Sequence, residues 1–242
     1  IDRRFTDKLV VGVGLGFGHD KASIGTDGSQ STATGTSGAI YASYQLNEKT
    51  YIDGLIGYGV TSMNSSRFVS PLTSYAASHR TANQIFGSVA ASYETRKYDM
   101  LFAPYGRLDF TVNKLNQTSE TGVGNYGLTY MDQTDRTLRA SLGVRAESAH
   151  ESDWGIVRPR MRAEFQHGFQ NGGSSQFAYN DQIGGPNYVV NSNVTDRNSI
   201  VAGVGGTLEM RNGLKLGLDY QIMRSFAQET SQGVRVTLEK EL

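Results

Sequence analysis

The 242-residue chain carries no net formal charge, contains no cysteine and is 38% hydrophobic. Balanced charge gives no electrostatic reason to expect nucleic acid as a partner. The lack of cysteine fits an oxidising compartment where a large sheet needs no disulfide, although cytosolic proteins can lack cysteine too. No apolar run approaches the roughly 20 residues of a transmembrane helix, which excludes helical spanning and leaves spanning by strands open.

Ten segments alternate between apolar and polar residues with a period of two, which places successive side chains on opposite faces of a strand. In chain order, the predicted strands are Leu9–Gly18, Gly38–Tyr44, Tyr51–Gly59, Gln84–Glu94, Met100–Val112, Leu138–Glu147, Val157–Phe169, Ile200–Met210, Leu214–Ile222 and Gly233–Glu239. Most are near the ~9–11 residues with which a tilted strand crosses a bilayer. The pattern therefore predicts an all-β, antiparallel chain.

The connections between these strands alternate in length. Long polar loops are predicted at Ser23–Gly35, Thr61–Arg80, Asn113–Gly127 and Asn171–Asp196. Short turns separate them, and Asn212-Gly213 is a typical hairpin turn. Long loops at one rim and short turns at the other are typical of a β-barrel in an outer membrane.

The pattern of the segment Val157–Phe169 is compatible with two fold classes. One face carries three arginines and Glu164, and the other is apolar and includes Pro159 in mid-strand. A soluble antiparallel sheet can present such faces to water and to a core. A membrane barrel presents them to a wet lumen and to lipid. Because the same pattern recurs along the chain and the loop lengths alternate, the sequence favours the transmembrane barrel.

Alternation also predicts which charged residues face the lumen. The expected lumen-lining residues are Asp53, Glu94, Arg107, Asp109, Arg139, Arg145, Glu147, Arg158, Arg160, Arg162, Glu164, Glu209, Lys215, Asp219, Arg235 and Glu239. Eight bases meet eight acids in this set, and enclosed charges must be paired or hydrated. The arginines at 158, 160 and 162 are interpreted as a pairing network that holds the lumen open, or alternatively as a lining that guides a threaded segment.

Several short motifs, in this order and spacing, resemble the autotransporter β-domain family of type V secretion. They are Asp2-Arg3-Arg4, Tyr41-Ala42-Ser43-Tyr44, Tyr51-Ile52-Asp53-Gly54, Pro104-Tyr105-Gly106-Arg107-Leu108 and Arg158-Pro159-Arg160-Met161-Arg162. The resemblance spans nearly all of residues 1–242 as a single domain. It implies a twelve-stranded barrel in the bacterial outer membrane, in contact with outer-membrane lipid, with long loops extracellular and short turns periplasmic. It also implies a translocator that anchors an N-terminal passenger and exports it to the cell surface.

The sequence departs from the family pattern at both ends. Only ten strands are visible, so the family's first two strands and its pore helix are expected upstream of Ile1. The family's C-terminal signal for the barrel-assembly machinery is matched by Ser231, Gly233, Val236 and Leu238, with leucine in place of the usual aromatic residue; the chain continues to Leu242. The inward glycines at 12, 14, 16 and 18 either permit a bend in the wall or mark where that helix packs.

No motif predicts catalysis or a cofactor. The spacing Gly12-x-Gly14-x-Gly16 is not that of a dinucleotide site, and the four histidines are interpreted as residues at strand ends rather than metal ligands. A protease site built from His19, Asp20 and His79 is a minor alternative. Two functions remain open: an autotransporter translocator without enzyme activity, and a free-standing small pore or structural barrel.

Overall fold

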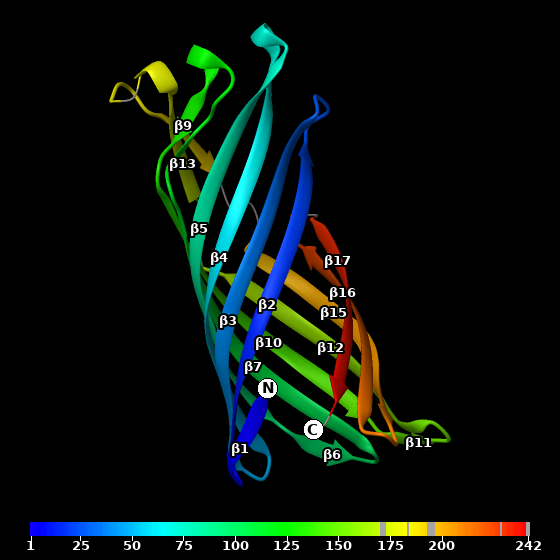
Figure 1. Cartoon of the computed structure of the whole chain (residues 1–242). Helices are drawn as coiled ribbons and strands as arrows, with labels where there is room; N and C mark the ends of the chain where they lie inside the picture. The colour runs from blue at the N-terminus through cyan, green and yellow to red at the C-terminus, as the bar shows by residue number, and fades with distance from the viewer. Residues whose placement is uncertain (170–172, 183, 193–196, 228, 241–242) are drawn as a thin grey trace.

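The computed structural model describes the chain except for residues 170–172, 183, 193–196, 228 and 241–242. Its main feature is a tall antiparallel sheet of 13 strands that curls around a central space (Figure 1). Along the sheet lie β1 (Asp2–Thr6), β2 (Leu9–Ile24), β3 (Ser29–Asn47), β4 (Thr50–Val69), β5 (Ser74–Tyr93), β7 (Met100–Leu115), β10 (Gln133–Ser148), β12 (Gly155–Gly168), β15 (Asn198–Met210), β16 (Leu214–Ser225) and β17 (Thr230–Lys240). The short strands β6 (Thr95–Lys97) and β11 (His150–Ser152) pair with β7 and β12 at the short-turn end.

A second sheet stands at the opposite end, where the long connections lie. It contains β14 (Tyr188–Ser192), β13 (Gly173–Tyr179), β9 (Leu128–Tyr130) and β8 (Thr118–Ser119), in that order. Three short 3-10 turns are η1 (Ser70–Leu72), η2 (Gly124–Tyr126) and η3 (Asn180–Gln182). We call this second sheet with its turns the rim cap.

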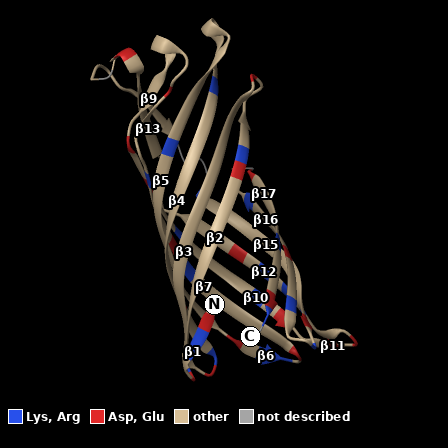
Figure 2. Cartoon of the chain, in the orientation of Figure 1, with Lys and Arg blue, Asp and Glu red and all other residues tan. Residues whose placement is uncertain are grey.

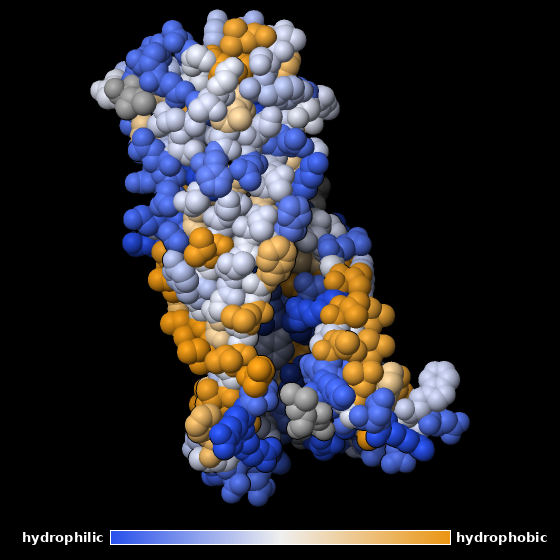
Figure 3. All heavy atoms as spheres, in the orientation of Figure 1, coloured by the Kyte–Doolittle hydropathy of each residue, from blue (hydrophilic) through white to orange (hydrophobic). Residues whose placement is uncertain are grey.

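Neighbouring long strands of the main sheet pair over most of their length, with register shifts at Arg4/Thr6 and at Gln45/Asn47, so most backbone polar groups satisfy one another. Strands β7 and β10, for example, pair without a shift from Leu115↔Gln133 to Met100↔Ser148. A structure in lipid needs such pairing because the bilayer core offers no water. Strands β1 and β17 are the two ends of the path, and no pairing joins them within the described residues. The space-filling view shows a deep hollow between the two walls on this side (Figure 3).

The hydrophobic residues lie mainly on the outer face of the sheet instead of in a core. Leu15 is 96% exposed and Leu142 is 68% exposed, and hydrophobic side chains gather in a band over the lower half of the visible outer surface (Figure 3). The only cluster of buried hydrophobic residues found among the described ones is Val69, Ala76 and Val123, beneath the rim cap. A continuous apolar band of this kind marks a surface covered by something other than water.

The structure confirms the all-β antiparallel class and contains all ten predicted strands, but two of the predicted loops are wrong. Most of Ser23–Gly35 and Thr61–Arg80 is strand, because β2 to β5 extend to 16–20 residues. These extensions are largely polar on both faces, and those of β3 to β5 are rich in serine and threonine, so no apolar alternation indicates a strand there. The first hairpin turns at Gly25 and Gly28, whose φ angles are +66° and +86°, and the second turns at η1.

Three further differences concern short elements. Strand β1, which pairs Asp2 with Gly12, was not predicted, and it brings the path to eleven strands. The segment 128–137 could be expected to extend the predicted strand Leu138–Glu147, but it is not wholly continuous with it, since β9 belongs to the rim cap and β10 begins at Gln133. The predicted loop 171–196 contains β13 and β14, while residues 171–172, 183 and 193–196 lie outside the described residues.

Candidate functional site

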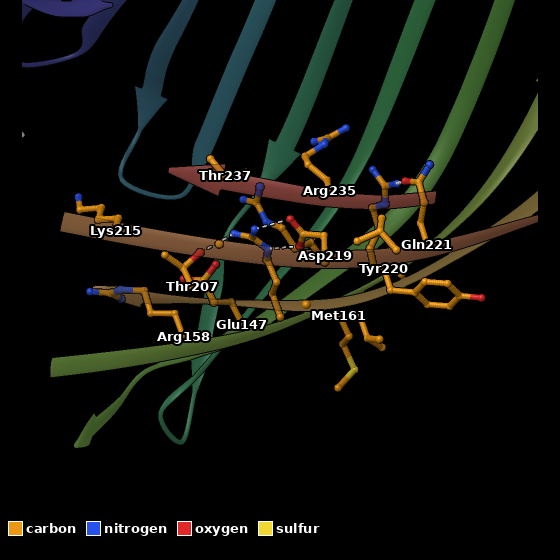
Figure 4. A pocket seen from close by; sticks show the side chains of 18 of the residues that line it. Glu147, Arg158, Met161, Thr207, Lys215, Asp219, Tyr220, Gln221, Arg235 and Thr237 are labelled. Carbon is orange, nitrogen blue, oxygen red and sulfur yellow. Dashed lines mark hydrogen bonds and ion pairs between the residues drawn. The ribbon is translucent and has the colours of Figure 1, made fainter. Parts of the chain in front are cut away.

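The inner faces of β10, β12, β15, β16 and β17 line a cavity of about 730 Å³ (Figure 4). Among the residues predicted to face inward, those that line it are Arg145, Glu147, Arg158, Arg160, Arg162, Glu209, Lys215, Asp219, Arg235 and Glu239. In the close-up, Asp219, Lys215 and Arg235 point into this space, whereas Met161 and Tyr220 point to the other side of the wall. Alternation along each strand thus separates a charged inner face from an apolar outer face.

The best-defined contact in the cavity joins Arg160 on β12 to Asp219 on β16. The Arg160 Nε and Nη2 atoms donate to the two Asp219 carboxylate oxygens, each at 2.6 Å, and Nη1 donates to Thr207 Oγ1 at 3.1 Å. Both side chains remain about one-third exposed. A two-point charge-assisted contact fixes both side chains without closing the space around them.

Weaker pairs continue this network on the same wall. Glu209 accepts from Arg158 Nε at 3.4 Å and lies 3.7 Å from Lys215 Nζ. Arg162 Nη2 donates to Gln221 Oε1 at 2.8 Å. Arg145 Nη2 on β10 pairs with Glu94 at 3.1 Å. These contacts distribute both charge signs over the wall.

A second cluster on β7 and β12 is centred on Glu164, whose carboxylate is fully buried. Tyr105 and Gln166 both donate to it, and Arg107 Nη2 lies 3.2 Å from it. Arg107 also donates to Asp109 through Nε at 2.8 Å. Alternation predicted the charged members, but Gln166 was missed as a partner because an uncharged inward residue carries no signal of its own.

The remaining predicted inward residues stand apart from these clusters. Asp53 on β4 and Arg139 on β10 form no ion pair within the described part of the chain. Strand β3 carries no charged residue at all, and β4 carries only Asp53 and Arg67. Charge is sparse on the β2–β5 wall and dense around β10–β17 (Figure 2). Charged residues of the interior are therefore concentrated on one wall. Alternation alone did not predict this uneven distribution.

The inward glycines of β2 differ from one another in their surroundings. A Cβ at Gly12 would lie 2.2 Å from the Tyr41 ring, whose hydroxyl donates to Asp2 at 3.0 Å. At Gly14 and Gly18, nothing lies within 4 Å of the added atom. Close approach of a β3 side chain thus explains the glycine at position 12. At Gly14 and Gly18 the space beside the backbone is open.

The rim cap holds an ion pair between a buried carboxylate and a partly exposed arginine that the sequence did not predict. Arg67 near the end of β4 donates to Glu120 through Nε at 2.9 Å and Nη2 at 2.6 Å, and Glu120 is only 4% exposed. Leu128 N and Tyr130 Oη also donate to Glu120, at 2.9 and 3.4 Å. Burial, with the Glu120 charge nearby, raises the pKa of Tyr130. This centre ties the β4–β5 hairpin to the long connections.

The residues expected to form an assembly signal all lie on β17, the last strand of the path. Val236 pairs with Leu218 and Leu238 with Leu216, and both are about two-thirds exposed on the outer face. Ser231 pairs with Met223 and Gly233 with Gln221. Residues Glu241 and Leu242 lie outside the described residues.

The residues weighed for catalysis are not brought together. His19 Nδ1 contacts Thr34 Oγ1 at 3.1 Å, and His79 Nδ1 contacts Asn64 Oδ1 at 2.9 Å. Two strands, β3 and β4, separate β2 from β5, so the two histidines lie on distant parts of the wall. Across the described residues, no group of three potential metal ligands is found, nor is any helix long and apolar enough to cross a membrane.

Comparisons with known proteins agree with this geometry. A family model described as the autotransporter beta-domain matches residues 1–221. The fold is similar to the translocator domain of autotransporter NalP from Neisseria meningitidis, with a TM-score of 0.80, 18% identity and coverage of 99% of this chain and 77% of that one. It is also similar to the β domain of the Bordetella autotransporter BrkA, with a TM-score of 0.71, 14% identity and coverage of 100% and 88%. Comparison with curated protein sequences gives no match.

Proposed function

Because the chain belongs to the autotransporter β-domain family and is an outer-membrane translocator domain, we propose that its charged inner wall borders the path of an N-terminal passenger. The observation that carries this proposal is the combination of an apolar outer face with an inner cavity whose charged side chains are paired yet still partly exposed. An extended passenger segment exposes polar backbone groups and charged side chains. Such a segment passes more easily along a wet wall of both charge signs than along an apolar one.

The orientation in the membrane is part of the same proposal. Short connections at residues 7–8, 48–49 and 211–213 lie at one end of the sheet, and the rim cap lies at the other. Barrels of outer membranes carry short turns on the periplasmic side and larger loops outside. We therefore place the rim cap and the tips of β2 to β5 at the cell surface.

We propose further that residues preceding Ile1 contribute a pore helix and additional strand pairing, as the family resemblance implies. Two observations support this. The edges of β1 and β17 do not pair within the described residues, and lipid does not tolerate an open strand edge. The inner face at Gly14 and Gly18 also leaves room for a closely packed neighbour. We also propose that the barrel-assembly machinery recognises the outer face of β17 during insertion.

The test follows the passenger in the full-length protein, with an epitope near the passenger N-terminus. We expect protease added to intact cells to remove the epitope, and deletion of residues 214–242 to leave it protected. Surface exposure that persists after this deletion would overturn the translocator role. A free-standing pore predicts a signal peptide immediately upstream, an ion conductance and no exported segment.

A further inference from the structure

The charges on the outer face of the long strands are all positive. Strand pairing assigns each residue to the inner or the outer face, and the lysines and arginines assigned outward on the ten long strands are Lys21, Lys114, Arg136, Arg224 and Lys240. In the described part of these strands, every aspartate and glutamate falls on the inner face. The outer face thus lacks the balance of signs that the inner face shows.

Four of these cations lie near the rim-cap end of their strands, above the apolar band. Lys114 and Arg224 are the last outward residues of β7 and β16, and Arg136 is two residues from the exposed Leu138 on β10. Each lies within four residues of the outermost large apolar residue on the outer face of its strand. A cation at this level lies where hydrocarbon gives way to charged head groups.

Lys114 and Arg136 are neighbours across two paired strands. Lys114 pairs with Thr134, and Arg136 pairs with Val112, so the two cations are diagonal on the outer face. Diagonal residues are roughly 7–8 Å apart, and side chains of this length can converge on one group between them. Both are exposed, and neither forms an ion pair with any described residue.

The surroundings of this pair suit an anion attached to a lipid. Asn83 and Thr134 lie directly opposite Lys114 on its two neighbouring strands and supply neutral hydrogen-bonding groups. The nearby Asp132 carboxylate is engaged with the backbone N–H of Gln117 at 2.6 Å. Below the pair, Phe110 and Leu138 expose 41% and 45% of their surface. Cations above an apolar surface match a phosphate above acyl chains.

We propose that Lys114 and Arg136 form a site for the phosphate of an anionic lipid in the outer leaflet. The inference rests on the proposed function, because it needs this end of the sheet to be at the cell surface. Arginine binds phosphate through two parallel hydrogen bonds, and lysine adds a point charge. The lipid chains lie against the apolar band beneath, so head group and tail are recognised together.

The test measures lipid binding to the detergent-solubilised protein by native mass spectrometry. The probes are bisphosphorylated lipid A, zwitterionic phosphatidylethanolamine and inorganic phosphate. We expect selective retention of lipid A and little retention of the other two. The double variant K114Q/R136Q should bind lipid A at least about tenfold more weakly, since one charge-assisted contact accounts for that much. The control variant K49Q/K97Q, which removes two exposed lysines at the short-turn end, should bind as the parent does.

Equal binding of phosphatidylethanolamine, or equal loss in both double variants, would overturn the site. Tight binding of inorganic phosphate alone would also overturn it, since it would show an anion site without lipid. Fractionation of cells separates this result from the proposed function. If K114Q/R136Q reaches the outer membrane and exports its passenger, a failure of lipid selectivity concerns only this site. If the parent protein is absent from the outer membrane, the proposed function itself fails.

Discussion

Arg160 and Asp219 form their two-point ion pair across an intervening strand, directly above Gly205. Gly205 on β15 pairs with Arg160 on one side and with Asp219 on the other. A Cβ at Gly205 would lie 2.2 Å from Asp219 Oδ1 and 2.6 Å from the Leu218 carbonyl oxygen. The missing side chain is what allows two residues on non-adjacent strands to meet.

The first prediction concerns this glycine. Gly205→Ala should lower the free energy of unfolding by about 1–3 kcal/mol, because the new atom overlaps both a side chain and a backbone carbonyl. Urea unfolding of the refolded protein measures the loss. Gly203→Ala is the matched control, since its Cβ would meet only ordinary contacts, the nearest at 3.5 Å. Equal stability of the two variants would show that the ion pair does not depend on Gly205.

The second prediction separates the two faces of the wall. Ile56→Arg places a charge on the outer face of β4 and should cost about 2–4 kcal/mol if that face meets the bilayer midplane. Ser43→Arg places the same side chain inward on β3, opposite Asp53, where water and a carboxylate receive it. Heat-modifiable gel mobility should be lost or reduced in the first variant and retained in the second. Similar damage in both would contradict the assignment of faces.

The third prediction concerns the rim cap. Glu120→Ala removes the buried carboxylate that pairs with the partly exposed Arg67 guanidinium, and the loss of such charge-assisted hydrogen bonds costs about 1–3 kcal/mol. The effect should be local, because the main sheet pairs independently of β8, β9, β13 and β14. Limited proteolysis should become faster within β8, β9, β13 and β14, while heat-modifiable mobility stays as in the parent. The exposed Glu151 on β11 provides the control Glu151→Ala, for which no change is expected.

The fourth prediction concerns the outer face of β17. Leu238→Asp should reduce the amount of protein in the outer membrane of cells more than it reduces refolding into detergent, because only the cell uses an assembly signal. Leu238→Phe should insert as well as the parent or better. Immunoblots of membrane fractions, compared with refolding yields, make the distinction. Unchanged outer-membrane levels of Leu238→Asp would argue against a signal at this position.

The strands with one apolar and one polar face could be predicted from the sequence. Leu214–Ile222 and Leu138–Glu147 alternate strictly, and each lies inside an observed strand. The ends of β2 to β5 could not be predicted, because both of their faces are largely polar and no change in polarity marks a strand there. Strand β1 was missed for a different reason: five residues are too few to show a period.

The inner site could likewise be predicted only in part. Alternation placed Arg160 and Asp219 on one face, but only the register of three strands shows that they meet over Gly205. Pairing partners depend on register, and register depends on turn geometry and long-range packing that a period of two does not encode. The Arg67–Glu120 pair was beyond reach because it joins a strand to a long connection 53 residues away.

The unequal length of the strands determines which parts of the protein antibodies and bacteriophages would contact first. On β4 the last large residue of the apolar band is Val60, and the strand continues to Val69. At about 3.3 Å per residue and with the usual tilt of a barrel strand, the β4–β5 tip stands roughly 20–25 Å above the band. In the proposed orientation, antibodies and bacteriophages would reach the β2–β3 and β4–β5 hairpins first. Substitutions at these tips would alter immune recognition while leaving the lipid-facing surface and the inner cavity unchanged.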